Sequence, residues 1–198
     1  MHILNKRSKS KVLCASIVVF FAWLAILLQL YLTEGSVLNF FSYFTILCNF
    51  LIALSLTFST FMSKTSAGIF FSSGSVQTAT ALYIFIVGLV YNLVLRGLWV
   101  LTGWQLVVDN MLHVVSPILY ILYWLIFSPK EKLNWKNGIY WTIFPLCYLI
   151  YSLIRGAIVN WYPYPFLNVG NIGYEKVFIN VFAMFFFVFY CWFVLYCS

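Results

Sequence analysis

Five side chains able to carry acid–base or nucleophilic chemistry interrupt long apolar stretches of this sequence: Thr45, Arg96, Asp109, His113 and Arg155. Asp109 precedes His113 by four residues, so on a helix its carboxylate can orient or stabilise the imidazole. Histidine is the side chain that most readily exchanges a proton near neutral pH. A threonine becomes a nucleophile when a neighbouring base takes its proton, and His113 facing Thr45 across two helices would be that base. The pattern predicts a catalytic set of Thr45, His113 and Asp109.

A row of polar side chains lies in the stretch FSYFTILCNF, residues 41–50. Ser42, Thr45 and Asn49 are spaced i, i+3, i+7, which puts all three on one side of a helix. Such a row either lines a site or holds helices together, because hydroxyl and amide groups commonly hydrogen-bond between membrane helices. For Thr45, position alone leaves both alternatives open.

Substrate contacts would come from other polar groups at a similar depth. An oxyanion needs donors, and Asn49 or Arg96 would serve because mid-helix N–H groups are already used. Arg96 and Arg155 are suited to bidentate binding of a carboxylate, although snorkelling to the interface is the alternative for both. The full set of predicted substrate-binding residues is Asn49, Arg96, Arg155, Ser42, Trp99, Asn110 and Tyr164.

The elements that must position these groups are membrane helices. Of 198 residues, 64% are hydrophobic and 8% charged, against the roughly 25% charged residues of a soluble domain. The sequence predicts an all-α polytopic fold, a single domain over residues 1–198. Its six spans, each near the ~20 residues needed to cross a bilayer, are 12–32, 40–62, 77–97, 108–127, 138–158 and 176–197.

The basic residues predict the orientation of these spans. Four lie in the N-terminal tail, Lys64 lies in the second connection and three lysines lie at 130–136, whereas the other side has only Lys176. This asymmetry predicts that both termini are cytoplasmic, in a plasma (cytoplasmic) membrane. Thr45, Arg96, Asp109, His113 and Arg155 would then share the outer leaflet, where buried ionisable groups mark function.

Several classes of site and partner are not indicated. The five cysteines are dispersed without a C-x-x-C, and the two histidines are far apart, so the sequence predicts no disulfide framework and no metal. No phosphate loop or dinucleotide fingerprint is present, and no cofactor is expected. Scattered basic residues argue against nucleic acid as a partner. The expected partners are membrane lipids and a lipid or fatty-acid-ester substrate.

The connection NWYPYPFLNVGNIGYEK, residues 160–176, is rich in aromatic residues. Pro163 and Pro165 fix an extended segment, and Gly170 and Gly173 permit a turn before the last span. The segment is predicted to be an ordered cap that contributes Tyr164. An aromatic anchor at the membrane interface is the alternative.

The motifs FSYFTILCNF, RGLW, DNMLHVVSP, YSLIRG and YPYPFLNV resemble the bacterial six-span Pr-six-Pr membrane proteins over nearly the whole chain. That family is distantly similar to the androgen-induced and androgen-dependent membrane hydrolases, which cleave fatty acid esters of hydroxy fatty acids with an intramembrane threonine and histidine. The resemblance implies that Thr45 is the nucleophile and His113 the base.

The sequence therefore predicts an intramembrane lipid-ester hydrolase with an acyl-threonine intermediate, or an acyltransferase that uses the same residues. A small transporter or lipid-binding protein, with His113 and Asp109 relaying protons, is the alternative. The inner halves of the predicted spans look almost wholly apolar, which argues against a path across the membrane. A purely structural membrane subunit is the third possibility.

Overall fold

The computed structural model describes residues 2–129 and 134–197, and over this part of the chain it is helical without a strand. The predicted all-α fold is confirmed. Six helical stretches of the described residues are long and apolar enough to cross a membrane, which makes the chain a multi-pass membrane protein. They run over Lys9–Leu32, Phe44–Phe61, Gly74–Leu95, Gly103–Phe127, Lys136–Val159 and Val169–Val194.

Contacts between helices divide the chain into two compact units. Unit 1 comprises residues 1–41 and 45–131, and unit 2 comprises residues 42–44 and 132–198.

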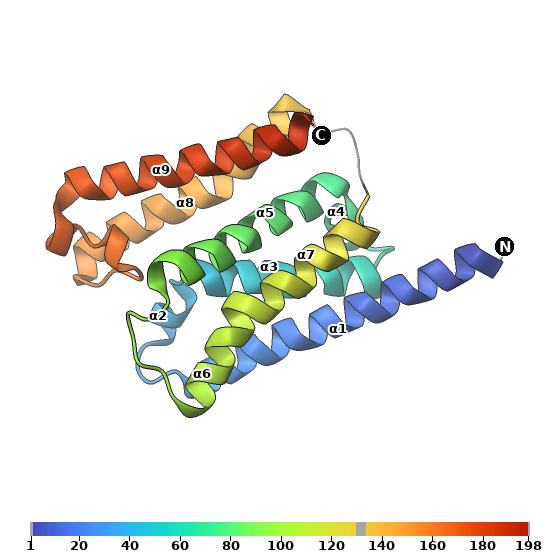
Figure 1. Cartoon of the computed structure of the whole chain (residues 1–198), viewed down its shortest axis with the longest axis horizontal. Helices are drawn as coiled ribbons and strands as arrows, with labels where there is room; N and C mark the ends of the chain where they lie inside the picture. Colours follow the sequence, from blue (N-terminus) through green and yellow to red (C-terminus); the bar gives the residue numbers. More distant parts are fainter. Residues whose placement is uncertain (1, 130–133, 198) are drawn as a thin grey trace. The chain divides into compact units, whose positions relative to one another are not determined.

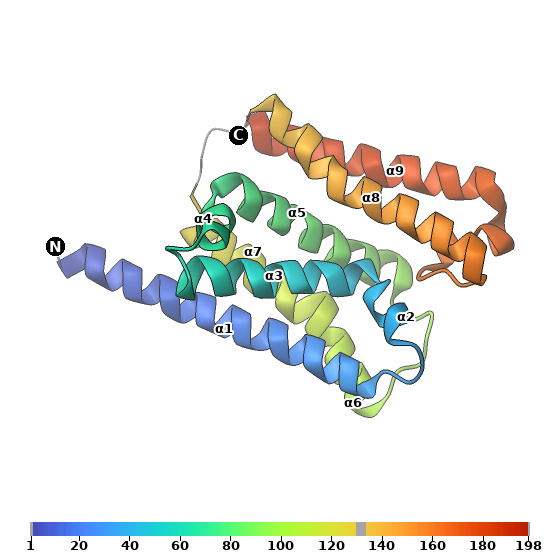
Figure 2. The same ribbon diagram turned by 180° about the vertical axis from the view of Figure 1, so that it is seen from behind.

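Unit 1 is a bundle in which α1, α3, α5 and α7 lie side by side (Figures 1 and 2). On α1, small side chains at Ala15, Val18, Ala22 and Ala25 form one buried face, the spacing that lets membrane helices approach closely. The helices of the unit are α1 (His2–Leu32), α2 (Val37–Phe41), α3 (Phe44–Phe61), α4 (Ser66–Ser72), α5 (Gly74–Val90), η1 (Tyr91–Leu95), α6 (Gly103–Asn110), η2 (Met111–Val115) and α7 (Ser116–Phe127).

Three predicted spans differ from the observed helices in instructive ways. The span predicted over 40–62 is interrupted at residues 42–43, between α2 and α3. The span predicted over 77–97 contains the π-helical turn η1, and the span predicted over 108–127 contains the π-helical turn η2. π-Turns are rare in proteins overall, and those that occur are often found at functional sites. Both π-turns lie in unit 1.

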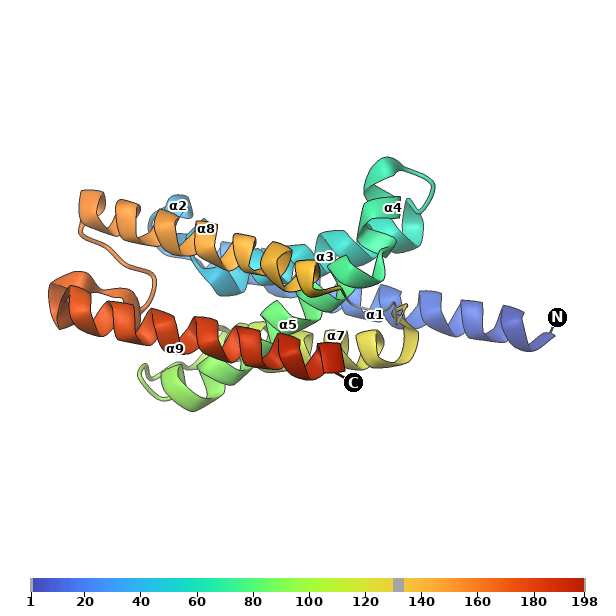
Figure 3. The same ribbon diagram turned by 90° about the horizontal axis from the view of Figure 1, so that it is seen from above.

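Unit 2 contains α8 (Trp135–Val159), the short 3₁₀ helix η3 (Pro165–Leu167) and α9 (Val169–Cys197), with α8 and α9 running alongside each other (Figure 3). Asn134 begins α8 with a capping box: its side chain accepts from the Lys136 amide, and Asn137 Oδ1 accepts from the Asn134 amide. Near this end, Gly138 allows the ring of Trp192 to approach, since a Cβ there would lie 2.6 Å from it.

The C-terminal end of α8 depends on a left-handed residue. Asn160 has φ 51° and ψ 33° and is exposed. Asparagine tolerates this conformation better than other non-glycine residues, which explains why α8 ends where it does. A β-branched side chain would strain the same turn.

Replacing Asn160 with valine is expected to lower the free energy of unfolding by about 1–2 kcal/mol, because a β-branched residue is poorly accommodated at positive φ. Asn160→Gly, the matched control, should leave it within a few tenths of a kcal/mol of wild type or raise it. Unfolding by sodium dodecyl sulfate in mixed micelles, followed by circular dichroism, measures both. Equal stability of the two variants would contradict the role given to this residue.

Candidate functional site

The π-turn η2 frees backbone carbonyls in the middle of a membrane span. The Ser116 amide donates to the carbonyl of Met111 rather than to that of Leu112, and Pro117 has no N–H to give to the carbonyl of His113. Carbonyls without partners are costly in a hydrocarbon solvent. The Ser116–Pro117 pair therefore leaves the carbonyls of Leu112 and His113 without donors in their own helix, and other side chains must supply them.

Two asparagine side chains donate to these carbonyls. Asn49 of α3 is fully buried, and its Nδ2 donates to the carbonyl of Leu112 at 3.2 Å and to that of Thr45 at 2.9 Å. Asn92 of η1 places its Nδ2 3.4 Å from the carbonyl of His113. Because both amide hydrogens of Asn49 are engaged, it can act as the predicted oxyanion donor only by giving up one of these bonds.

The ring of His113 is held on two sides. Its Nδ1 lies 2.9 Å from the backbone carbonyl of Asp109 and 3.2 Å from the carboxylate of the same residue, and its face stacks on Tyr91 with the ring centroids 3.8 Å apart. A carbonyl only accepts, so Nδ1 carries the hydrogen and Nε2 holds the lone pair of the neutral ring. The hydroxyl of Tyr91 donates to the other carboxylate oxygen of Asp109.

Beside this pair lies a polar pocket of about 400 Å³. Arg96 reaches it from the end of η1, where its guanidinium donates to Asn110 Oδ1 at 2.7 Å and lies 5.8 Å from the ring centroid of Tyr91. Its lining brings together four of the predicted residues, and the complete lining is Tyr91, Arg96, Gly97, Trp99, Val100, Leu101, Leu106, Asp109 and Asn110.

Thr45 lies one helical turn before Asn49, in the first turn of α3, and is buried. The contact between Asn49 and the Leu112 carbonyl therefore brings the Thr45 end of α3 near the turn that carries His113. Within the described residues, the hydrogen bonds of the His113 ring go to Asp109, and none joins it to Thr45.

The other three predicted residues, Ser42, Arg155 and Tyr164, belong to unit 2. Ser42 joins the chain to α8: its hydroxyl shares a 2.7 Å hydrogen bond with Tyr151, and its carbonyl accepts from Tyr148 at 2.9 Å. The guanidinium of Arg155 lies 5.0 Å from the centre of the Trp161 ring. Tyr164 stacks on Phe166, so the aromatic connection is ordered within its own unit.

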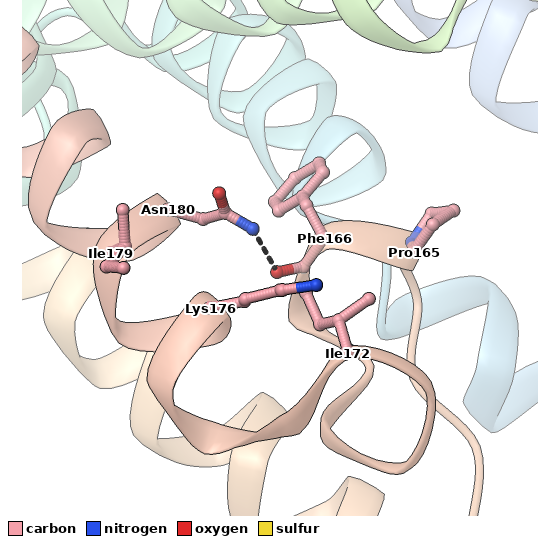
Figure 4. Close-up of a pocket in the computed structure, with 6 residues that line it drawn as sticks. All are labelled: Pro165, Phe166, Ile172, Lys176, Ile179 and Asn180. Atoms are coloured by element: carbon pink, nitrogen blue, oxygen red, sulfur yellow. Dashed lines mark hydrogen bonds between the residues drawn. The ribbon is translucent and has the colours of Figure 1, made fainter.

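Unit 2 has a pocket of its own, of about 380 Å³, which sequence reasoning missed (Figure 4). Apolar side chains from η3 and α9 form most of it, and Lys176 extends along its edge. Asn180 fixes η3 to α9 because its Nδ2 donates to the Phe166 carbonyl at 3.1 Å. The remaining lining residues are Pro165, Ile172 and Ile179.

Sequence reasoning also missed two residues that contact His113 and Asp109 in unit 1. Tyr91 and Asn92 look like ordinary members of an apolar span, and no spacing rule separates them from packing residues. The signal that was present is the Ser116–Pro117 pair, which removes a donor within a span and predicts that some side chain must replace it. In the part of the chain that the structure describes, no three histidine, cysteine, aspartate or glutamate side chains gather as metal ligands.

Replacing Asn49 with leucine is expected to cost about 1–3 kcal/mol, because the buried Leu112 carbonyl loses its donor. Asn92→Leu is the matched control: Asn92 is exposed and its bond to the other carbonyl is long, so the loss should stay below about 0.5 kcal/mol. Thermal unfolding in detergent measures both. Equal losses would show that the buried carbonyl does not depend on Asn49.

Comparisons with known proteins found no protein family, no curated protein and no solved structure that matches this chain. Function must therefore be argued from the geometry of unit 1.

Proposed function

We propose that this chain is an intramembrane lipid-ester hydrolase in which His113 moves the proton. The observation that carries the proposal is the hydrogen bond from His113 Nδ1 to Asp109, which leaves Nε2 as the basic nitrogen. A buried carboxylate in this position also stabilises the imidazolium that forms during proton transfer. Tyr91 limits the motion of the ring by stacking on it and holds Asp109 through its hydroxyl.

In the proposed reaction, Thr45 Oγ1 attacks the ester carbonyl carbon while its proton passes to His113 Nε2. The carbon–oxygen bond to the alcohol then breaks as His113 returns the proton to the departing oxygen. Water, deprotonated by the same nitrogen, hydrolyses the acyl-threonine and restores the hydroxyl. A second alcohol in place of water makes the reaction an acyl transfer. The support for Thr45 is its place one turn from Asn49, which bonds to the turn that carries His113.

Recognition of the substrate is assigned to the pocket that Arg96 lines. Its guanidinium is fixed by Asn110 and presents a cation beside apolar Trp99 and Leu101. This combination suits an amphiphile with a carboxylate, such as a fatty acid ester of a hydroxy fatty acid. The substrate class comes from the resemblance to the Pr-six-Pr proteins and their distant hydrolase relatives.

Turnover of a hydroxy-fatty-acid ester by the purified protein tests the proposal. His113→Gln is expected to lower turnover by about 10²–10⁴-fold, the usual contribution of a general base. Thr45→Ala should abolish turnover, whereas Thr45→Ser keeps a hydroxyl and should retain part of it. Thr57→Ala, on the same helix but bonded to Trp23, is the matched control and should behave as wild type. Wild-type turnover in Thr45→Ala would exclude the acyl-threonine mechanism.

A second candidate is binding or transport of an anionic amphiphile. The observation that favours it is that the lining of the Arg96 pocket includes neither Thr45 nor His113. Movement of a labelled fatty acid across liposomes, without ester turnover in any preparation, would favour this candidate over hydrolysis.

We also propose a plasma-membrane location with both termini cytoplasmic and the His113 end of unit 1 facing outward. In a background without native cysteines, an impermeant maleimide added to intact cells is expected to label Lys176→Cys and not Lys64→Cys, because the excess of basic residues stays inside. Permeabilised cells should label both. The reverse pattern in intact cells would invert the orientation.

A further inference from the structure

The interior of unit 1 is more polar than the sequence led us to expect. Beyond the His113 cluster, polar side chains on three helices are buried at depths where the spans were predicted to be almost wholly apolar. They come from α3, α5 and α7 and include Ser55, Gln77, Thr78, Thr80, Ser116 and Tyr120. Buried polar groups are costly in a membrane, and their grouping calls for a physical reason.

Helical spacing places these groups in a line. Ser116, Tyr120 and Tyr123 follow one another at intervals of four and three residues, which keeps them on one face of α7, and Ser116 comes three residues after His113 of η2. Ser116, Tyr120 and Tyr123 are each at most 2% exposed, so this face points into the bundle.

Partners from α5 lie along the same face. The hydroxyl of Tyr120 donates to the carbonyl of Gln77 at 3.3 Å. One turn farther along α7, Trp124 Nε1 donates to Thr78 at 3.0 Å. We call this line of groups, from His113 to Gln77 and Tyr123, the polar column.

The polar column extends along most of the bundle. Gln77 is in the first turn of α5, and Tyr91, which stacks on His113, directly follows the last residue of that helix. Positions 77 and 91 are 14 residues apart, which corresponds to about 21 Å at 1.5 Å per residue. At the His113 end the column meets Asp109, which lines the polar pocket.

Five buried side-chain atoms on α3, α5 and α7 have no hydrogen-bond partner among the described residues: Asn49 Oδ1, Ser55 Oγ, Gln77 Oε1, Ser116 Oγ and the hydroxyl oxygen of Tyr123. Each such atom costs about 1–3 kcal/mol if it stays unpaired. Buried water usually satisfies groups of this kind when several of them line the same space. Their position at successive levels is what a chain of water molecules requires.

We propose that the polar column is a hydrated proton path that connects the Asp109–His113 pair to the Gln77 end of unit 1. A proton enters at one end, and each hydroxyl or water gives up one proton as it accepts another, so that an equal proton leaves at the far end. His113 takes part by accepting on Nε2 and releasing from the same nitrogen. No oxidant or other reactant is needed, and the path does not depend on ester hydrolysis.

Proton flux into liposomes tests this inference with the complete protein. Purified protein is reconstituted with a pH-sensitive dye inside, and a potassium gradient with valinomycin supplies the voltage. Wild type is expected to acidify or alkalinise the lumen faster than protein-free liposomes. Ser116→Ala and Tyr120→Phe should each slow the flux about tenfold, because each removes one link of the hydrogen-bonded chain. Ser16→Ala on α1, whose hydroxyl bonds to its own helix, is the matched control and should conduct as wild type.

Two results would overturn the proton path: flux through wild type that equals flux through protein-free liposomes, or full flux through both Ser116→Ala and Tyr120→Phe. Equal thermal stability of the variants in detergent excludes misfolding as the cause of a lower flux. Ester turnover measured on the same preparations distinguishes the two proposals. Loss of turnover with retained proton flux would contradict only the proposal that the protein is a hydrolase. Retained turnover without flux would contradict only the proton path.

Discussion

The hydrogen bond from Asn49 Nδ2 to the carbonyl of Leu112 is the contact on which the rest of unit 1 depends. Ser116 and Pro117 interrupt the regular bonding of a membrane span, and the lipid chains around a span offer no donor to replace the missing one. Asn49 supplies it from α3, and Asn92 supplies a weaker contact to the carbonyl of His113 from η1. These two side chains bond the π-turn η2 to α3 and to η1.

This arrangement explains how the chain keeps an aspartate and a histidine together within a span. In η2 the chain makes i→i+5 bonds, and Nδ1 of His113 there lies within reach of two oxygens of Asp109, the backbone carbonyl oxygen and one carboxylate oxygen. Tyr91 occupies the ring face and the other carboxylate oxygen. A paired and hydrogen-bonded carboxylate is far less costly to bury than an isolated one. The same contacts leave the lone pair of the neutral imidazole on Nε2.

Sequence reasoning predicted the helical class and all six spans because apolar runs of about 20 residues have one stable solution in a membrane. It also predicted that Asp109 and His113 would be neighbours, since they are four residues apart on a helix, and the two side chains are in contact. It missed the break at residues 42–43 and both π-turns, because hydropathy marks the length of a span and not the breaks and irregular turns within it, although the Ser116–Pro117 pair signalled one of them. It also missed Tyr91 and the polar column, because single serines, threonines and tyrosines in an apolar run resemble packing residues until their partners are known. The catalytic and substrate-binding roles of all the predicted site residues stay predictions.

The central claim is that Asp109 holds the neutral ring of His113 with the hydrogen on Nδ1, which leaves Nε2 as the base. Nitrogen-15 NMR of histidine-labelled protein in detergent tests it directly, and replacing His2 leaves a single histidine to observe. We expect the neutral ring to show a protonated Nδ1 and an unprotonated Nε2, and we expect Asp109→Ala to weaken that preference. A neutral ring with its hydrogen on Nε2 in the otherwise unaltered protein would contradict the account.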